Sequence, residues 1–437
     1  MTPIRVTETT DNGKGDTSGS LSWAIKKANA DAGDDTIVLT QNVQIGGVMK
    51  PLLNSNIKLT GDDPDTPAIE TFTIDGNRHR PLFVKSGTIQ IDHLTLTNGI
   101  AEGGKTLTGG GGAGMGAALF IYGGDVTIVD STFTNNWAVN GYAGRSVHSG
   151  GGGMGGNANA GGGGLFDAAT DSGGGFGGDS AYGSGGAGLG AGGNGNFGGG
   201  GGYGDTPTNG GNGGFGGGGG GSTASGGNGG FGGGGGGGTS GGLGGYGGGG
   251  GGGSTGTPGS AGFGGNAGTA AAMGGAIFIR TGSLTISKTT FDSNTVEAGQ
   301  ARALGGAIFA MKSISNPNGN NQGMPSALPK VVLSEDFVFK GYMVYDNTYR
   351  RSSQPGVTPA TFSSGTDLYT SDLWGTTISR GSSTTALSPE ATPVPNLKPR
   401  PKVPAPVQPI VEDTSTETTS SDTGNTSTDT GNTGTDP

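Results

Sequence analysis

The same pair of motifs stands on either side of a long glycine-rich stretch, and this repetition constrains the fold more than any other feature of the chain. The segments 115–120 and 273–278 read MGAALF and MGGAIF, and a third copy, GGAIF, occupies 305–309. In the first two copies a further phenylalanine follows 13 residues after the first one, at Phe133 and at Phe291. The second and third copies are 31 residues apart, but the first and second are 158 apart. The difference, about 127 residues, is therefore an insertion into one loop of a repeating scaffold.

Outside the insertion, short segments of alternating apolar and polar residues predict β-strands. Their phase is constant: the pairs Ile91 and Leu96, Ile128 and Phe133, and Ile286 and Phe291 are each five residues apart. Constant phase predicts a coil of stacked rungs, in which equivalent residues lie about 4.8 Å apart along the axis. The predicted strand segments are 56–61, 71–76, 82–84, 88–99, 118–136, 276–294 and 307–311.

Three residue types recur in the repeat, and each has a predicted place. Glycines allow a tight corner where a Cβ would clash, asparagines satisfy backbone groups at bends, and phenylalanines stack inside the coil. The structural repeat residues are Gly116, Phe133, Asn136, Gly274, Gly275, Phe291, Asn294, Gly305 and Gly306.

Near the N-terminus, apolar residues at helical spacing predict one short helix. Ser20 is the expected N-cap and Gly33 the expected stop. We expect this helix to cover the open end of the β structure, where an unpaired sheet edge would otherwise be exposed.

Two sets of motifs carry a resemblance to known families. The GGA[IL] motif followed by FxxN resembles the repeat of the chlamydial polymorphic outer-membrane proteins. The segment GSLSWAIKKANADAGDDTIVL, with TIDGN and LTLTNG after it, is similar to the start of many right-handed parallel β-helix proteins of the pectin-lyase-like class. The resemblance covers about residues 1–140 and 271–383. It implies an all-β, right-handed parallel β-helix with an N-terminal capping helix.

Residues 141–270 form the glycine-rich insertion, which contains near-repeats such as GGNGGFGGGGGG. Aromatic residues recur every 15 to 18 positions. One interpretation is a flexible loop, because ordering glycine costs about 1–2 kcal/mol per residue with few side chains to compensate. The other is a bundle of extended polyglycine-II rods, one per repeat, which resembles the glycine-rich receptor-binding sandwich of certain bacteriophage tail adhesins. The recurring aromatics favour the second interpretation, and their positions are Phe197, Phe215, Phe231, Tyr246 and Phe263.

The rest of the chain sets few further limits. Residues 384–411 are proline-rich and predict an extended linker, and residues 412–437 predict a disordered acidic Thr/Ser-rich tail. The net charge of −10 and the lack of a basic patch argue against nucleic acid as a partner. There is no cysteine, no apolar run long enough to span a membrane, and no visible signal peptide.

Catalytic chemistry has little support in the sequence. The residues Asp75, Asp92 and Asp125 lie on or beside strands, where solvated turn carboxylates are the ordinary interpretation. The histidines His79, His93 and His148 show no metal-ligand spacing, so we expect no catalytic residue, metal or cofactor. Threonine pairs at alternating positions also occur, as on many exposed strands, and they give only slight support to ice binding.

These features predict a non-enzymatic structural or adhesive protein, located extracellularly or at a cell surface. Its β-helix would present the glycine-rich lattice to a surface glycan or another cell-surface component. Two alternatives stay open: a polysaccharide-active β-helix enzyme with a non-standard site, and a self-assembling matrix or filament component. Candidate ligand-contacting residues are Tyr203, Tyr246, Phe215 and Phe231.

Overall fold

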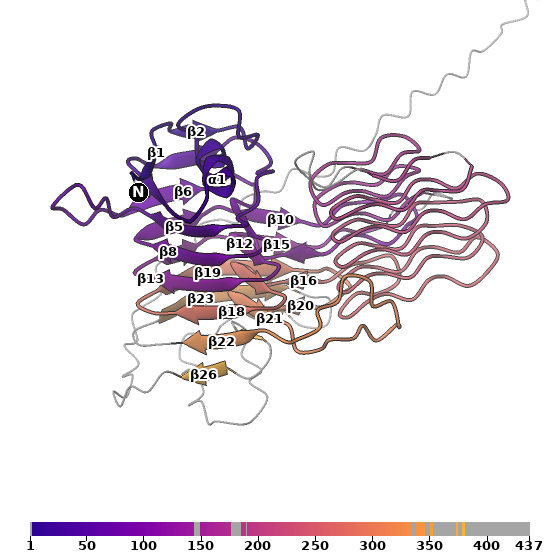
Figure 1. Cartoon of the computed structure of the whole chain (residues 1–437). Helices are drawn as coiled ribbons and strands as arrows, with labels where there is room; N and C mark the ends of the chain where they lie inside the picture. The colour runs from indigo at the N-terminus through magenta and orange to yellow at the C-terminus, as the bar shows by residue number, and fades with distance from the viewer. Residues whose placement is uncertain are drawn as a thin grey trace, which may run out of the picture. The chain divides into compact units, whose positions relative to one another are not determined.

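Most strands of the protein run parallel to one another in several sheets (Figure 1). A computed structural model describes residues 2–143, 149–175, 185–188 and 190–333, and the backbone of 338–345, 350–352, 373–374 and 378–380. The predicted linker 384–411, the predicted tail 412–437 and His148 lie outside the described residues.

Sheet A is parallel throughout its described strands, and its inward residues are aliphatic. Ile57, Ile89 and Val126 lie in one column of equivalent positions across neighbouring strands. All three are buried, so this face of the sheet belongs to the core. In spatial order the strands are β1 (Ile4–Val6), β3 (Asp34–Leu39), β5 (Asn56–Thr60), β8 (Thr88–Asp92), β13 (Asp125–Val129), β18 (Ser283–Ile286), β22 (Lys330–Leu333) and β26 (Ile378–Arg380).

Sheet B has the same parallel order, except for one antiparallel strand at its margin, β24 (Arg350–Ser352), beside β23 (Val338–Tyr345). β23 itself pairs with β19 in parallel. The other strands in spatial order are β10 (Ile100–Glu102), β15 (Trp137–Val139), β19 (Thr290–Glu297), β14 (Thr132–Thr134), β9 (Leu94–Thr97), β6 (Phe72–Asp75), β4 (Val43–Ile45) and β2 (Thr10–Asp11).

Two further parallel sheets lie at the repeated motifs: sheet C contains the end of each copy, and the strands of sheet D lie at or just before its start. Their register aligns the motif copies, so that Phe120 lies beside Phe278 and Phe278 beside Phe309. The strands of sheet C are β25 (Leu373–Trp374), β21 (Ile308–Ala310), β17 (Ile277–Ile279), β12 (Leu119–Ile121) and β7 (Leu82–Val84). Those of sheet D are β11 (Gly114–Met115), β16 (Ala272–Met273) and β20 (Ala303–Leu304).

The chain visits the sheets in a repeating order. From β11 onward it passes through sheets D, C, A and B, and it then starts the same cycle again at β16 and at β20. Each strand pairs in register with its equivalent in the next cycle. This arrangement of parallel strands is compatible with a β-helix-like fold.

The interior between sheets A, B and C is closed by stacked side chains. The Phe133 and Phe291 rings are stacked with centroids 5.2 Å apart. Beside them, Asn136 and Asn294 are fully buried and form a ladder in which the Asn136 Nδ2 donates to the Asn294 Oδ1 at 3.0 Å. The amide groups of this ladder also form hydrogen bonds with backbone atoms of Gly99 and Phe133. These buried backbone groups at the bend therefore have protein partners.

The one helix among the described residues, α1 (Leu21–Ala30), begins where the sequence predicts it. The Ser20 side chain caps it by accepting from the backbone N–H of Trp23. The helix ends at Ala30 rather than at Gly33, because Asp31 is already extended. Its apolar face, including Leu21 and Ile25, packs into the same core as β1 and β3.

The long glycine-rich segment leaves the sheets after β15 and returns at β16. The strands on either side of it pair directly, β12 with β17 and β13 with β18, although 158 residues separate their equivalent positions. In Figure 1 the segment forms extended, looped traces beside the strands.

Candidate functional site

Backbone hydrogen bonds in several directions order the glycine-rich segment. The successive N–H groups of Gly218, Gly219 and Gly220 donate to three different segments, at the carbonyls of Gly163, Gly234 and Gly211. The next repeat has the same pattern, with donors at 234–236. An extended chain with three residues per turn has no internal hydrogen bonds and directs its backbone groups outward in this way. We call this body the glycine lattice.

Glycine is required in the lattice because the backbones approach closely. A Cβ on Gly230 would lie 1.7 Å from the carbonyl oxygen of Gly214, and a Cβ on Gly245 would lie 1.7 Å from that of Gly230. No side chain fits at such separations, so the requirement comes from packing between segments. The lattice also takes in residues 103–113, which the sequence placed with the N-terminal β part; Gly110, for example, donates to Gly235.

Each aromatic residue of the repeats occupies a tight turn. Gly217 N–H donates to Gly214 O across Phe215 and Gly216, and Gly216 has a φ of +78°. A positive φ at the third position identifies a type II turn, which favours glycine there. Because a second turn lies at the far end, each repeat contributes two extended legs, and the prediction of one rod per repeat is wrong. The equivalent positive-φ glycines are Gly198, Gly216, Gly232, Gly247 and Gly264.

Two ladders of aromatic rings join the lattice to sheet C. In the lattice, the rings from Phe197 to Phe263 are stacked with centroids 5.0–5.2 Å apart. On sheet C, Phe83, Phe120, Phe278 and Phe309 form a second stack at 4.7–5.2 Å. The ladders meet edge to face, with Phe120 and Phe215 6.0 Å apart. Such pairs contribute about 0.5–1.5 kcal/mol beyond their buried area.

The four candidate ligand-contacting residues lie mostly within this interface. Phe231 and Tyr246 are fully buried and Phe215 is 6% exposed, so these rings present no free face to a ligand. Tyr203 is half-buried, and its backbone N–H donates to Ser172 O. The Tyr246 hydroxyl has no hydrogen-bond partner among the described residues, and burial raises the pKa of this group.

Two arginines reinforce the junction through backbone carbonyls. The Arg280 guanidinium donates to Gly323 O and Tyr122 O and lies 4.2 Å from the centre of the Tyr122 ring. Arg80 donates to the carbonyls of Gly116 and Met115, and burial lowers its pKa to about 10. Burial also lowers the pKa of Arg280. Arg80 thus has a structural role.

Sequence reasoning missed a loop that holds the lattice legs together. Three alternating side chains in residues 318–322 donate amide N–H groups to backbone carbonyls of the lattice. Each carbonyl lies two positions before the aromatic residue of a different repeat. The alternation of amide residues in NPNGNNQ was the signal available in the sequence. We call this loop the amide clasp, and its bonds are Gln322 to Gly213 at 2.6 Å, Asn320 to Gly229 at 2.7 Å and Asn318 to Gly244 at 2.7 Å.

The turns opposite the aromatic ladder carry hydroxyl side chains. Thr206 Oγ1 and Thr223 Oγ1 are 2.6 Å apart, and the Thr239 hydroxyl donates to Thr223 O at 2.7 Å. Neighbouring turns are therefore linked into a row. Its single charged residue is Asp205. We call this row the distal rim, and it comprises residues 205–208, 222–225, 239–240 and 254–258.

The candidate catalytic carboxylates lie apart from one another, and two of them accept hydrogen bonds from neighbouring residues. Asp75 accepts from Asn77 and Asn98, and Asp125 accepts from Ser283. Asp92 is different, because its carboxylate lies together with His93 and Asp130 at the corner between sheets A and B.

Ligand atoms of Asp92, His93 and Asp130 lie within 4.8 Å of one another. Lys58 pairs with Asp92 at 3.1 Å, and Lys288 lies 4.0 Å from Asp130. The cluster has the donor types of a divalent cation site. Two ammonium groups already compensate its carboxylates, so ion pairing alone accounts for the arrangement.

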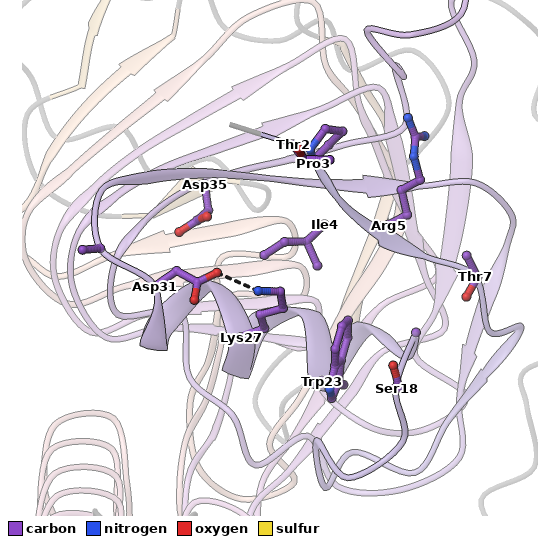
Figure 2. Close-up of a pocket in the computed structure, with 12 residues that line it drawn as sticks. Thr2, Pro3, Ile4, Arg5, Thr7, Ser18, Trp23, Lys27, Asp31 and Asp35 are labelled. Carbon is purple, nitrogen blue, oxygen red and sulfur yellow. Dashed lines mark hydrogen bonds and ion pairs between the residues drawn. The ribbon is translucent and has the colours of Figure 1, made fainter.

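An open hollow of 610 Å³ lies between α1 and β1 (Figure 2). Trp23, Lys27 and Asp31 line one side, and Lys27 pairs with Asp31 at 2.9 Å. Asp35 lines the other side; it is 6% exposed, and its Oδ2 has no hydrogen-bond partner among the described residues.

No protein family, no curated protein and no solved structure matches this chain. Within the part of the chain that the structure describes, no helix has the length and apolar character to cross a membrane.

Proposed function

We propose that the chain is a right-handed parallel β-helix of the pectin-lyase-like kind that acts without catalysis, as a structural or adhesive protein outside the cell or on its surface. The glycine lattice is a polyglycine-II body in this proposal, and it presents the distal rim to a surface glycan. The observation that carries the proposal is the lattice itself, whose hydrogen-bonded legs hold a row of hydroxyl groups at fixed spacing.

The chemistry of the distal rim supports a neutral, hydroxyl-bearing partner. Serine and threonine hydroxyls both donate and accept hydrogen bonds, as sugar hydroxyls do. A rim with one carboxylate and no cationic side chain offers little attraction to polyanions such as nucleic acid. Rigid presentation helps binding, because little conformational entropy is lost when the ligand docks.

A rim variant tests the proposal against a glycan panel and cell surfaces. Thr206, Thr223, Thr239 and Thr255 are changed together to alanine in the full chain. The matched control carries the same four changes on the outer faces of sheets A and B, at Thr95, Thr127, Thr132 and Thr285. We expect the rim variant to lose binding by at least about tenfold, with the control unchanged. Equal binding by both variants would contradict the proposal.

A carbohydrate-active enzyme is the second candidate, and the cluster of Asp92, His93 and Asp130 is the observation that favours it. Most glycoside hydrolases use a pair of carboxyl groups that flank the scissile bond. Turnover of a defined polysaccharide that is lost in both Asp92→Asn and Asp130→Asn would support this candidate. Binding without turnover supports the adhesive function.

Self-association into a matrix or filament is the third candidate. Sedimentation over a hundredfold concentration range tests it, because assembly shifts the mass distribution upward with concentration.

A further inference from the structure

A line of asparagine side chains crosses the glycine lattice, with one asparagine on each of three neighbouring legs. Asn194, Asn212 and Asn228 each lie three positions before the aromatic residue of their repeat. The Asn194 Oδ1 accepts from the backbone N–H of Asn212 at 2.8 Å, and the Asn212 Oδ1 accepts from that of Asn228 at 2.8 Å. The same bond from the Leu243 N–H to the Asn228 Oδ1 ends the series. We call the three asparagines the amide line.

These bonds fix each carboxamide and leave its donors available. Because a backbone N–H is bonded to the Oδ1, the Nδ2 group of each asparagine keeps two N–H donors for another partner. The three Nδ2 groups have no acceptor among the described residues. Asn194 is exposed, the other two asparagines are half-buried, and none of the three Nδ2 atoms is enclosed. A ligand can therefore reach the donors of the amide line.

Hydroxyl groups form a second line on the same legs, one turn away. Three residues of polyproline-II geometry advance roughly 9 Å. Between the lines Gly210 and Gly226 are half-buried, whereas Gly211 and Gly227 bond to inner legs and are buried. The two lines therefore border one accessible surface of the lattice, which we call the outer face. The hydroxyl line belongs to the distal rim and comprises Ser225, Ser240 and Thr257, each six positions before an aromatic residue.

The spacing of the legs limits which polymers can follow the two lines. The aromatic rings of these repeats are stacked 5.0–5.2 Å apart, so the legs repeat at this interval. A peptide advances about 3.3 Å per residue as a strand and about 3.1 Å as polyproline II, so neither one residue nor two match the interval. A β-1,4-linked pyranose chain is extended and advances by the length of one sugar ring, which matches it closely.

We propose that a linear, neutral, β-1,4-linked polysaccharide lies along the outer face, with successive sugar residues on successive legs. The amide line donates to oxygen atoms along one edge of the sugar chain, and the hydroxyl line contacts the other edge. Neither line contains a charged side chain, which suits a neutral polymer. This inference rests on the proposed glycan-binding function and names the class of glycan.

Calorimetry with β-1,4-linked glucose oligomers of two to six units tests the alignment. The legs from Asn194 to Ser260 supply five equivalent positions. Affinity should therefore increase with each added unit up to the pentamer and then level off, with a total gain of at least about tenfold. The α-1,4-linked oligomers of the same lengths form curved chains and are the comparison. Equal affinity for the two linkages, or no dependence on length, would overturn the proposal.

A double variant tests the amide line directly. Asn212→Ala together with Asn228→Ala removes two of the three amide donors, and we expect affinity for the β-linked hexamer to decrease by about tenfold or more. The matched control is Asn42→Ala together with Asn56→Ala. It removes the same kind of bond from a side-chain Oδ1 to a neighbouring backbone N–H, but in the β part, and should leave affinity unchanged. Hydrogen exchange of the lattice checks that the amide variant stays folded.

The outcomes separate this inference from the proposed function. If the amide variant binds the hexamer as the wild type does while the rim variant loses glycan binding, the alignment on the outer face is wrong and the adhesive function stands. If no oligomer and no other glycan binds the wild type, both are wrong.

Discussion

The β part and the glycine lattice are both stacks of repeated units, but different groups hold them together. In the β part, inward side chains such as Ile89 and Phe133 fill the space between sheets. In the lattice, the segments approach so closely that a Cβ would overlap a neighbouring carbonyl. The hydrophobic effect thus dominates one region and backbone hydrogen bonding the other.

The two regions also differ in how register is fixed. In the β part, a slip by one residue would turn the inward side chains outward. A lattice of glycines alone has no such penalty. Its register depends on the side chains at its edges, namely the aromatic turns and the amide clasp. The main role of side chains in the lattice is therefore to fix the register between neighbouring segments.

The largest expected effect comes from adding one methyl group inside the lattice. Gly230→Ala places a Cβ 1.7 Å from Gly214 O, and neither backbone can move without breaking its own bonds. We expect a loss of stability on the order of 4 kcal/mol or more within the lattice, measured by hydrogen exchange and chemical denaturation. Gly123→Ala, where the nearest atom is 3.5 Å from the Cβ, is the control. Similar losses in both variants would contradict close packing as the cause.

Removing one aromatic ring from each region should destabilise mainly the region that loses the ring. Phe231→Ala and Phe291→Ala each delete a buried, stacked phenylalanine, at an expected cost of about 3–5 kcal/mol. Hydrogen exchange should accelerate in the lattice for Phe231→Ala and in the β strands for Phe291→Ala. The same exchange pattern in both variants would mean that the two regions unfold as one.

A smaller effect, of opposite sign, is expected at Tyr246. Its hydroxyl is buried without a partner, whereas the equivalent positions of the other repeats carry phenylalanine. Tyr246→Phe should stabilise the chain by about 1 kcal/mol, because an unsatisfied polar group is removed. Thermal unfolding measures this change, with Tyr203→Phe at a half-buried position as the control. A clear loss of stability would show that the hydroxyl has a bonding role.

The smallest expected effect is a pH dependence from His79 in the β part. Burial, and then the charge of Arg78, lower the pKa of His79 below its usual value of about 6.5. The unfolded chain therefore binds a proton more readily as the pH falls through 6.5, and stability decreases. Unfolding at pH 7.5 and pH 5 should show a smaller decrease in His79→Gln than in the wild type. An identical pH dependence in both proteins would show that His79 does not contribute to the pH dependence of stability.

The sequence predicted the parallel β-rich character and the helix after Ser20, because both follow from local periodicity and capping. It did not predict that each glycine repeat forms two legs. The type II turn at Phe215 and Gly216 depends on a neighbouring ladder that the local sequence does not reveal. The amide clasp was missed for the same reason, since Asn320 acts on Gly229, 91 residues away. The buried Asp35 Oδ2 without a hydrogen-bond partner among the described residues is also a consequence of packing and has no sequence signal.

Amide hydrogen exchange across residues 190–268 of the full chain tests the central claim most directly. An ordered lattice predicts that glycines whose N–H groups are hydrogen-bonded in the structure, such as Gly218, Gly219 and Gly220, exchange orders of magnitude more slowly than an unstructured chain. Protection comparable to that of the strands in sheet A would support the account. Exchange at the rate of an unstructured chain would contradict it, and the distal rim would then have no fixed arrangement to present.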